Sequence, residues 1–157
     1  MHEHKQSISK AICVLNPTKG SDVSGTVTFT QTMQGIKVVA ELSGLSIGAH
    51  GFHIHEFGDC SSYDAKSAGG HWNPNNKNHG EWGSESHHMG DIANLFADSS
   101  GISSLKFETD LWCLDCKEES NNIIGKSIII HQGLDDFYSQ PSGNAGKRIG
   151  CGIISLI

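Results

Sequence analysis

The sequence predicts an all-β fold, a sandwich or a barrel of short strands. Glycine accounts for 19 of the 157 residues, aromatic side chains for only 7% and hydrophobic residues for 36%, which indicates many tight turns rather than long amphipathic helices. Apolar and polar residues also alternate with a period of two in several segments, the spacing of a half-buried strand. Eight short strands separated by glycine and Asx turns are typical of a sandwich or barrel.

Three N-terminal segments are the first of these strands. Residues 8–15 (ISKAICVL), 25–31 (GTVTFTQ) and 35–42 (GIKVVAEL) alternate over most of their length. Because successive side chains of a strand point to opposite faces, each segment can bury one face and expose the other. We therefore expect three half-buried strands here.

Five further segments complete the set in chain order. Residues 50–57 (HGFHIHEF) and 91–98 (DIANLFAD) are rich in large apolar side chains, and residues 102–109 (ISSLKFET) alternate again. Residues 126–132 (KSIIIHQ) and 151–157 (CGIISLI) are rich in β-branched side chains, which favour strands. All five are predicted strands.

Two long segments, residues 58–90 and 133–150, do not fit a strand pattern. The first is rich in Gly, Asn, Ser and His, and the second contains Pro141 and several glycines. Loops of this length are uncommon in a compact domain unless they serve a function or are tied down. We expect both loops to be functional.

One domain is expected to span residues 1–157, because this length can bury a core and no repeat or linker divides the chain. Residues 1–7, which include His2 and His4, are expected to be a frayed terminus.

The charge and the N-terminus exclude some classes of partner and suggest a location. A formal net charge of −6 argues against nucleic acid or an anionic membrane as the main partner, since both require a basic face. No apolar run approaches the ~18 residues of a membrane span, and the N-terminus has no apolar signal region. We expect a cytoplasmic protein that binds neither membrane nor nucleic acid.

Histidine supplies the clearest functional signal, with ten residues in the chain. His53 and His55 are two positions apart in a predicted strand, so their side chains project from the same face, about 6.6–6.8 Å apart along the strand. Taken alone, such a pair is more often a structural pair of histidines than a metal site. Further candidates follow it in the chain: His71, His79, His88, Asp91 and His131.

These side chains have the chemistry of a metal centre. Imidazole binds zinc and copper, and a carboxylate ligand suits zinc, which accepts mixed nitrogen and oxygen tetrahedra. A buried divalent ion among neutral imidazoles alone would keep its whole charge in a site of low dielectric, so an anionic ligand such as Asp91 is expected nearby. The number of candidate ligands is sufficient for two metal ions.

Five motifs, GFHIHEFGD, SAGGHWNPNNKNHG, HHMGD, IIIHQGLDD and GNAGKRIGCG, resemble in this order the metal-site and active-site signatures of copper/zinc superoxide dismutase. The resemblance covers roughly residues 8–157. It implies an eight-stranded Greek-key β-barrel or sandwich of immunoglobulin-like architecture with two long functional loops. It also implies an enzyme that disproportionates superoxide to dioxygen and hydrogen peroxide, cycling copper between Cu(II) and Cu(I).

The resemblance also implies the role of each metal-site residue. The match of HHMGD to the H-x-G-D of the family selects His88, and leaves His87 pointing to solvent. Asp135 would link a copper ligand to a zinc ligand, and His50 would be structural. The implied copper ligands are His53, His55, His71 and His131, and the implied zinc ligands are His71, which bridges the two metals, His79, His88 and Asp91.

Other matched positions concern substrate and stability. Arg148 matches the arginine that orients superoxide, a small anion that a guanidinium can bind through its forked donors. Cys60 and Cys151 match the intrasubunit disulfide of the family, and Cys13 matches a buried strand residue. The segment between His131 and Arg148 is shorter than in the animal enzymes and lacks their guiding lysine and acid cluster, which predicts weaker steering by distant charges.

Two cysteines, Cys113 and Cys116, fall outside the family pattern. They could form a redox pair, half of a zinc site, or an incidental or locally disulfide-bonded pair.

The resemblance further implies partners: superoxide, a second copy of the chain in a homodimer, and possibly a copper chaperone. Residues 123–125, the HEFGD loop and the apolar C-terminus resemble the elements of the dimer contact. The alternatives are a metallochaperone and a copper-only or non-catalytic module.

Overall fold

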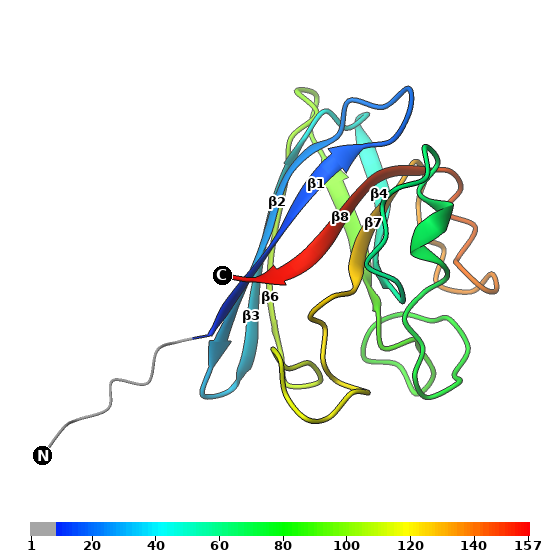
Figure 1. Cartoon of the computed structure of the whole chain (residues 1–157). Helices are drawn as coiled ribbons and strands as arrows, with labels where there is room; N and C mark the ends of the chain where they lie inside the picture. Colours follow the sequence, from blue (N-terminus) through cyan, green and yellow to red (C-terminus); the bar gives the residue numbers. More distant parts are fainter. Residues whose placement is uncertain (1–8) are drawn as a thin grey trace, which may run out of the picture.

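The computed structural model describes residues 9–157, and these residues form eight antiparallel strands with almost no helix (Figure 1). This architecture confirms the predicted all-β class. Residues 1–7, with His2 and His4, lie outside the described residues. The strands are β1 (Lys10–Pro17), β2 (Ser24–Thr32), β3 (Gly35–Ser43), β4 (Gly48–His55), β5 (Asp91–Ala97), β6 (Ser103–Thr109), β7 (Ser127–His131) and β8 (Arg148–Leu156). The one helical element within residues 9–157 is a 3₁₀ turn, η1 (Lys66–Ala68).

The eight strands form one sheet that is almost closed into a barrel. Their order is β5-β4-β7-β8-β1-β2-β3-β6, so the neighbours β4 and β7, β8 and β1, and β3 and β6 are not consecutive in the chain. Such long returns between antiparallel strands are consistent with a Greek-key barrel. Among residues 9–157, no helix has the length and apolar character needed to cross a membrane.

The last strand begins earlier than the sequence predicts. The strand was expected over residues 151–157, but β8 starts at Arg148, which pairs with His131 at the end of β7. Gly150 lowers strand propensity, yet its backbone pairs with Ile130 of β7 and with Pro17 of β1. Pairing with two neighbours overrides the local preference of this segment, and it places Arg148 beside the histidine at the end of β7.

The alternating pattern of β1, β2 and β3 fills the barrel with one face of each strand. Cys13 is one of these core side chains, as expected, and burial raises the pKa of its thiol to about 12. On β4, by contrast, residues on both faces are buried from position 50 to position 55. Phe52 and Ile54 pack in the barrel core, whereas His53 and His55 project outward and are covered by the long loops.

The two long loops lie on the same side of the barrel, beyond β4 and β7 (Figure 1). The chain after β4 turns back along that strand, where His71 forms a β-bridge with His55 and the Trp72 amide donates to the Ile54 carbonyl at 2.8 Å. A disulfide between Cys60 and Cys151 ties this loop to β8. The loop is therefore anchored at its start and along β4.

A second disulfide joins Cys113 and Cys116 in the segment between β6 and β7. Of the alternatives that the sequence left open for this pair, the structure shows the local disulfide. The Trp112 ring, next to Cys113, donates from Nε1 to the Met89 carbonyl at 3.0 Å, which joins this segment to the loop before β5.

Replacing Cys151 with serine is expected to lower the free energy of unfolding by ~4–5 kcal/mol, because the bond closes a loop with a sequence separation of 91 and so restricts the unfolded chain. Denaturant unfolding of the metal-free protein without reductant measures this loss. Cys116→Ser is the control: its bond spans a separation of only 3, and the same relation gives a loss of ~2 kcal/mol or less. Equal losses for the two variants would contradict the expectation.

Candidate metal centre

Four histidines from three parts of the chain meet on the outer face of β4. His53 and His55 belong to β4, His131 ends the neighbouring strand β7, and His71 arrives on the returning loop. One ring nitrogen from each lies within 4.8 Å of the others, and all four side chains are buried. We call these residues, His53, His55, His71 and His131, the first group.

Each member of the first group uses one ring nitrogen for a protein contact. His53 Nε2 pairs with Asp135 Oδ2 at 2.7 Å, His55 Nδ1 with the Gly69 carbonyl at 2.8 Å, and His131 Nδ1 with the Gly146 carbonyl at 2.9 Å. A carbonyl or carboxylate can only accept, so the proton of the neutral ring is on the paired nitrogen. The second nitrogen of each ring is left with its lone pair free.

The free nitrogens of the first group have no hydrogen-bond partner although they are buried. Buried polar atoms in proteins are nearly always paired, so several orphaned atoms at one point require an explanation. A metal ion accepts the lone pairs of imidazole nitrogens, so one ion would give all of these orphaned atoms a partner at once. The orphaned atoms of this group are His53 Nδ1, His55 Nε2, His71 Nε2 and His131 Nε2.

A second group surrounds the Asp91 carboxylate: His71, His79, His88 and Asp91. Asp91 Oδ1 lies 2.8 Å from His71 Nδ1, 2.8 Å from His79 Nδ1 and 3.5 Å from His88 Nδ1. Ligands at 2.0–2.1 Å from a zinc ion lie ~3.3 Å apart in a tetrahedron, which these separations approach. Its one carboxylate and three imidazoles also match the mixed donor set of zinc.

The other oxygen of Asp91 holds the carboxylate in place. Asp91 Oδ2 accepts from the His88 amide at 2.7 Å and from the Gly80 amide at 3.1 Å. Burial alone would raise the pKa of Asp91, but the hydrogen bonds from the surrounding histidines outweigh it and hold the pKa well below its usual range. Asp91 is therefore a permanent negative charge in this group.

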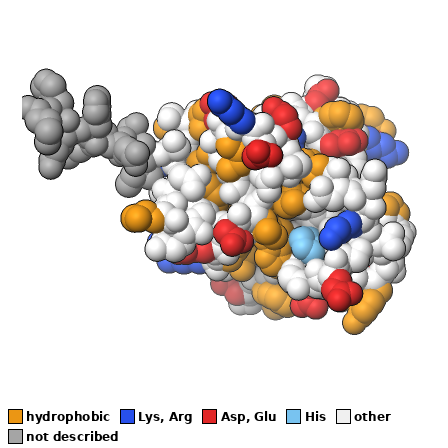
Figure 2. Space-filling view, turned by 90° about the horizontal axis from the view of Figure 1, so that it is seen from below, with side chains coloured by type: hydrophobic (Ala, Val, Ile, Leu, Met, Phe, Trp, Pro, Cys, Tyr) orange, Lys and Arg blue, Asp and Glu red, His pale blue; other side chains and the backbone are white. Residues whose placement is uncertain are grey.

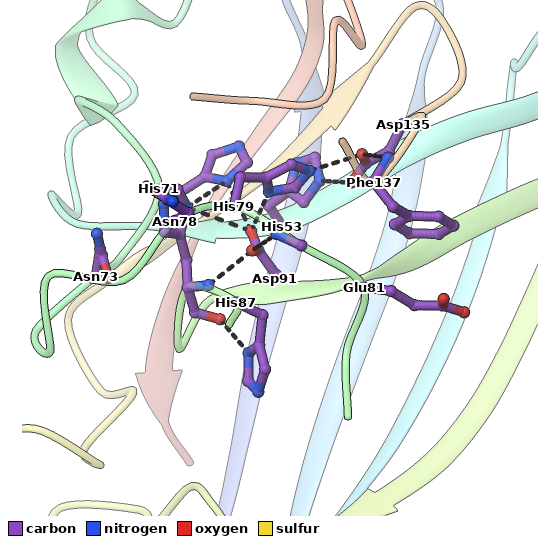
Figure 3. Close-up of polar contacts among 12 residues, drawn as sticks. His53, His71, Asn73, Asn78, His79, Glu81, His87, Asp91, Asp135 and Phe137 are labelled. Atoms are coloured by element: carbon purple, nitrogen blue, oxygen red, sulfur yellow. Dashed lines mark hydrogen bonds and ion pairs between the residues drawn. The ribbon is translucent and has the colours of Figure 1, made fainter. Parts of the chain in front are cut away.

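Asp135 connects the two groups. Its Oδ2 contacts His53 Nε2 of the first group and its Oδ1 contacts His79 Nε2 of the second, both at 2.7 Å. Figure 3 shows His79 between the carboxylates of Asp91 and Asp135. Asn94 of β5 fixes Asp135 in turn: it donates to the Asp135 carbonyl at 3.0 Å and accepts from the Asp135 amide at 2.8 Å.

Burial keeps the first group neutral. It lowers the pKa of His53 to about 3 and that of His131 to about 4, and it also lowers the pKa values of His55 and His71. Neutral imidazole is the form that binds a metal ion. His79 differs, because its two carboxylate partners outweigh burial and raise its pKa to about 9. The ring of His79 therefore carries an extra proton when no metal is bound, and a bound cation would take the place of that proton.

Arg148 lies next to the first group. Its main chain pairs with that of His131, and its half-buried side chain donates from Nη1 to the Ala65 carbonyl at 2.9 Å. Burial lowers the pKa of the guanidinium, but the ordinary pKa of this group is so high that it stays charged. This charge contributes to the lowered pKa values of His55 and His131. The face of the molecule in Figure 2 carries scattered acidic and basic side chains with hydrophobic side chains between them.

In the part of the chain that the structure describes, two other histidines lie outside these groups. His50 is buried and contacts the His131 carbonyl at 2.8 Å and the Ser46 carbonyl at 2.7 Å, so it is structural, as the sequence predicts. The prediction that His87 points to solvent was wrong. Its ring packs against Trp82 at a centroid distance of 5.1 Å, and its Nδ1 donates to the His88 carbonyl at 2.7 Å, so it is only partly exposed.

Sequence reasoning missed three residues that support the centre: Asn94, Gln140 and Gly143. An asparagine among apolar residues of a buried strand was the available signal for Asn94. Gln140 and Gly143 left no such signal, because their contacts with His79 arise only when the two long loops meet.

A barrel that carries two adjoining buried groups of imidazole and carboxylate donors, with one histidine common to both, defines a protein built for a pair of metal ions. The family model described as copper/zinc superoxide dismutase (SODC) matches residues 23–154, and the chain belongs to this family. The enzyme of this family is an oxidoreductase that uses copper and zinc, and the donors of both groups suit these metals.

Gly143→Ala is expected to break the link through Asp135. The new Cβ would overlap the Asp135 carboxylate and lie 2.7 Å from His79 Nε2, and the backbone φ of +70° adds strain. Gly146→Ala is the matched control, because its φ is +81° but nothing lies within 4 Å of its Cβ. The control should lose only the ~1–2 kcal/mol of backbone strain, and Gly143→Ala ~2 kcal/mol more. Denaturant unfolding of the metal-free variants measures both, and equal losses would refute the steric argument.

Proposed function

We propose that this protein catalyses the disproportionation of superoxide to dioxygen and hydrogen peroxide. The observation that carries the proposal is the convergence of four buried, unpartnered ring nitrogens, from His53, His55, His71 and His131, beside a charged arginine. Nitrogen donors of this kind suit copper, and the arginine offers a binding site for a small anion. Membership of the copper/zinc superoxide dismutase family supports the same reaction.

The first group would hold copper and the second group zinc. When bound, copper would supply the one-electron redox chemistry by alternating between Cu(II) and Cu(I). Asp91 and a deprotonated His71 would contribute two negative charges to the second group, which balance the charge of a zinc ion and remove much of the cost of its burial.

His71 would belong to both shells. Its Nδ1 lies 2.8 Å from Asp91 Oδ1 in the second group, whereas its Nε2 is the unpartnered atom that points to the first. The formation of hydrogen peroxide consumes two protons, so a group beside the reacting oxygen must deliver one. His71 Nε2 is placed to hold such a proton and to return to its deprotonated form afterwards.

Arg148 would bind and orient the superoxide anion. Its pairing with His131 and its bond to the Ala65 carbonyl hold the guanidinium beside the first group. Because it retains its charge at any working pH, it attracts an anion and can donate two hydrogen bonds to it. Lys147, the exposed neighbour of Arg148, adds positive charge at this edge.

The short loop between His131 and Arg148 would leave these local charges as the main attraction for superoxide. The formal net charge of the chain is −6, so the attraction of an anion depends on the local field of Arg148 rather than on the overall charge.

The chain would function as one domain over residues 1–157 and form a symmetric homodimer. Three exposed apolar side chains, Val14 at 51%, Phe57 at 55% and Ile153 at 42%, support a contact face. Gly58, Gly125 and Ile153 also lie together, since a Cβ on Gly58 would meet the Gly125 carbonyl and lie 3.4 Å from Ile153 Cγ2. The cytoplasmic location of the protein, and a copper chaperone as its partner, remain predictions.

Metal analysis and removal test the proposed reaction. The protein should contain one copper and one zinc per chain, and chelation should abolish rapid removal of superoxide, which copper and zinc together restore. A metallochaperone would bind metal without rapid turnover of superoxide, and a copper-only module would take up no zinc. Either of these results would exclude the proposed function.

Arg148→Ala is expected to lower kcat/KM for superoxide about 10- to 100-fold, because a charge-assisted hydrogen bond contributes ~1.5–3 kcal/mol. The dependence of the rate on ionic strength should weaken as well. Pulse radiolysis over a range of salt concentrations measures both effects. Lys37→Ala, which removes one positive charge from β3, is the control and should change neither by more than about twofold. An unchanged rate and salt dependence in Arg148→Ala would contradict the assigned role.

Ile153→Asp is expected to convert the dimer to a monomer, because it places a charge in the proposed apolar contact. Sedimentation velocity at micromolar concentration measures the state of the chain. Ile47→Asp serves as the control, since Ile47 is 72% exposed in the turn before β4 and should leave the dimer intact. A monomeric parent protein at that concentration would rule out the dimer.

A further inference from the structure

Gln140, in the loop between β7 and β8, makes two hydrogen bonds to the main chain of His79, and we call this pair of bonds the clamp. Its Oε1 accepts a hydrogen bond from the His79 amide at 2.7 Å, and its Nε2 donates to the His79 carbonyl at 2.9 Å. The two residues are 61 positions apart in the chain. The side-chain amide thus pairs with a peptide backbone as a neighbouring strand would.

This pairing fixes both peptide groups next to the His79 Cα atom. The direction in which a side chain leaves the backbone depends on these two peptides, so the bonds also fix the direction of the Cα–Cβ bond from which the imidazole extends. The ring then reaches Asp91 Oδ1 from Nδ1 at 2.8 Å and Asp135 Oδ1 from Nε2 at 2.7 Å. His79 is thereby held at its main chain by one residue and at its ring by two others.

The turn that presents Gln140 is itself well ordered by hydrogen bonds. The Asp136 carboxylate accepts from the amides of Tyr138 and Ser139, both at 2.8 Å. The Gly143 amide donates to the Ser139 carbonyl at 2.7 Å, and Gln140 Nε2 also donates to the Tyr138 carbonyl at 3.1 Å. Gln140 is exposed to solvent, so its position depends on these bonds rather than on packing in a core.

We propose that Gln140 is a positioning residue for the zinc ligand His79, and that its amide couples zinc affinity to the order of the loop between β7 and β8. The proposal rests on the proposed zinc role of the second group. Asp135 and Gln140 both belong to this loop, and both contact His79. A zinc ion that orders His79 therefore also orders this loop, and loss of the clamp weakens zinc binding.

Gln140→Met tests the clamp, because methionine keeps the length of the side chain but loses both hydrogen bonds. The expected result is a zinc dissociation constant raised ~10-fold in chelator competition, the usual size of effect for a residue that orients a ligand. Cobalt(II) bound at the zinc site should also show an altered visible spectrum. In the metal-free protein, hydrogen exchange of the His79 amide should be ~10-fold faster.

Two variants control for general destabilisation. Gln140→Glu keeps an oxygen that accepts from the His79 amide, so slow exchange of that amide should be retained. Gln31→Met removes a comparable pair of bonds, from Gln31 Nε2 to the Thr32 and Gly35 carbonyls at 3.1 and 3.0 Å in the β2–β3 hairpin, and should change neither zinc affinity nor the cobalt spectrum.

The outcomes separate this inference from the proposed function. If the parent protein binds one zinc ion but Gln140→Met binds it equally well, with an unchanged cobalt spectrum, Gln140 does not position His79. Equal weakening of zinc binding by Gln140→Met and Gln31→Met would overturn the inference too, because it would reflect a general loss of stability. A parent protein that binds no zinc would overturn the proposed function itself.

Discussion

The rest of the centre depends on the two hydrogen bonds that the Asp135 carboxylate makes. Each of its oxygens pairs with an imidazole of a different group, at 2.7 Å from His53 Nε2 and 2.7 Å from His79 Nε2. These bonds leave Nδ1 of His53 without a partner and turn Nδ1 of His79 toward Asp91 Oδ1 at 2.8 Å, so each Nδ1 can face a cation in its own group. One carboxylate therefore sets the ring orientation at both positions and fixes how far apart they lie. Asn94 extends this constraint to the barrel, because it clamps the Asp135 main chain to β5.

The barrel contributes rigidity, and the loops contribute burial. Phe52 and Ile54 anchor β4 in the core, so the alternate residues His53 and His55 must project outward with little freedom. The returning loop and the segment after β7 then cover these rings, which are buried. Burial keeps the rings neutral, while the carboxylates at Asp91 and Asp135 retain their charge through hydrogen bonds. The site thus combines neutral donors with permanent negative charges.

Much of the centre could be predicted because its signals are local. The spacing of His53 and His55 puts them on one face of a strand whatever the rest of the chain does, and the match of HHMGD to the H-x-G-D motif of the family selects His88 from an adjacent pair. The position of His87 was not predicted, because its contact with the ring of Trp82 depends on the irregular fold of the loop that holds both residues, which has no periodic pattern. The start of β8 at Arg148 was not local either, because it depends on pairing with β7 and β1.

The sequence by itself determined the strand class, the set of candidate metal ligands and the resemblance that relates them, because periodicity and residue chemistry are properties of short segments. The tertiary structure alone decided which nitrogen of each ring is free, that Asn94 and Gln140 hold the centre, and that Gly143 must lack a side chain beside Asp135. The physical reason is distance along the chain. The contacts of Asp135 with His53, of Gln140 with His79 and of Asn94 with Asp135 join residues that are 82, 61 and 41 positions apart. Such contacts form only when the barrel brings these segments together.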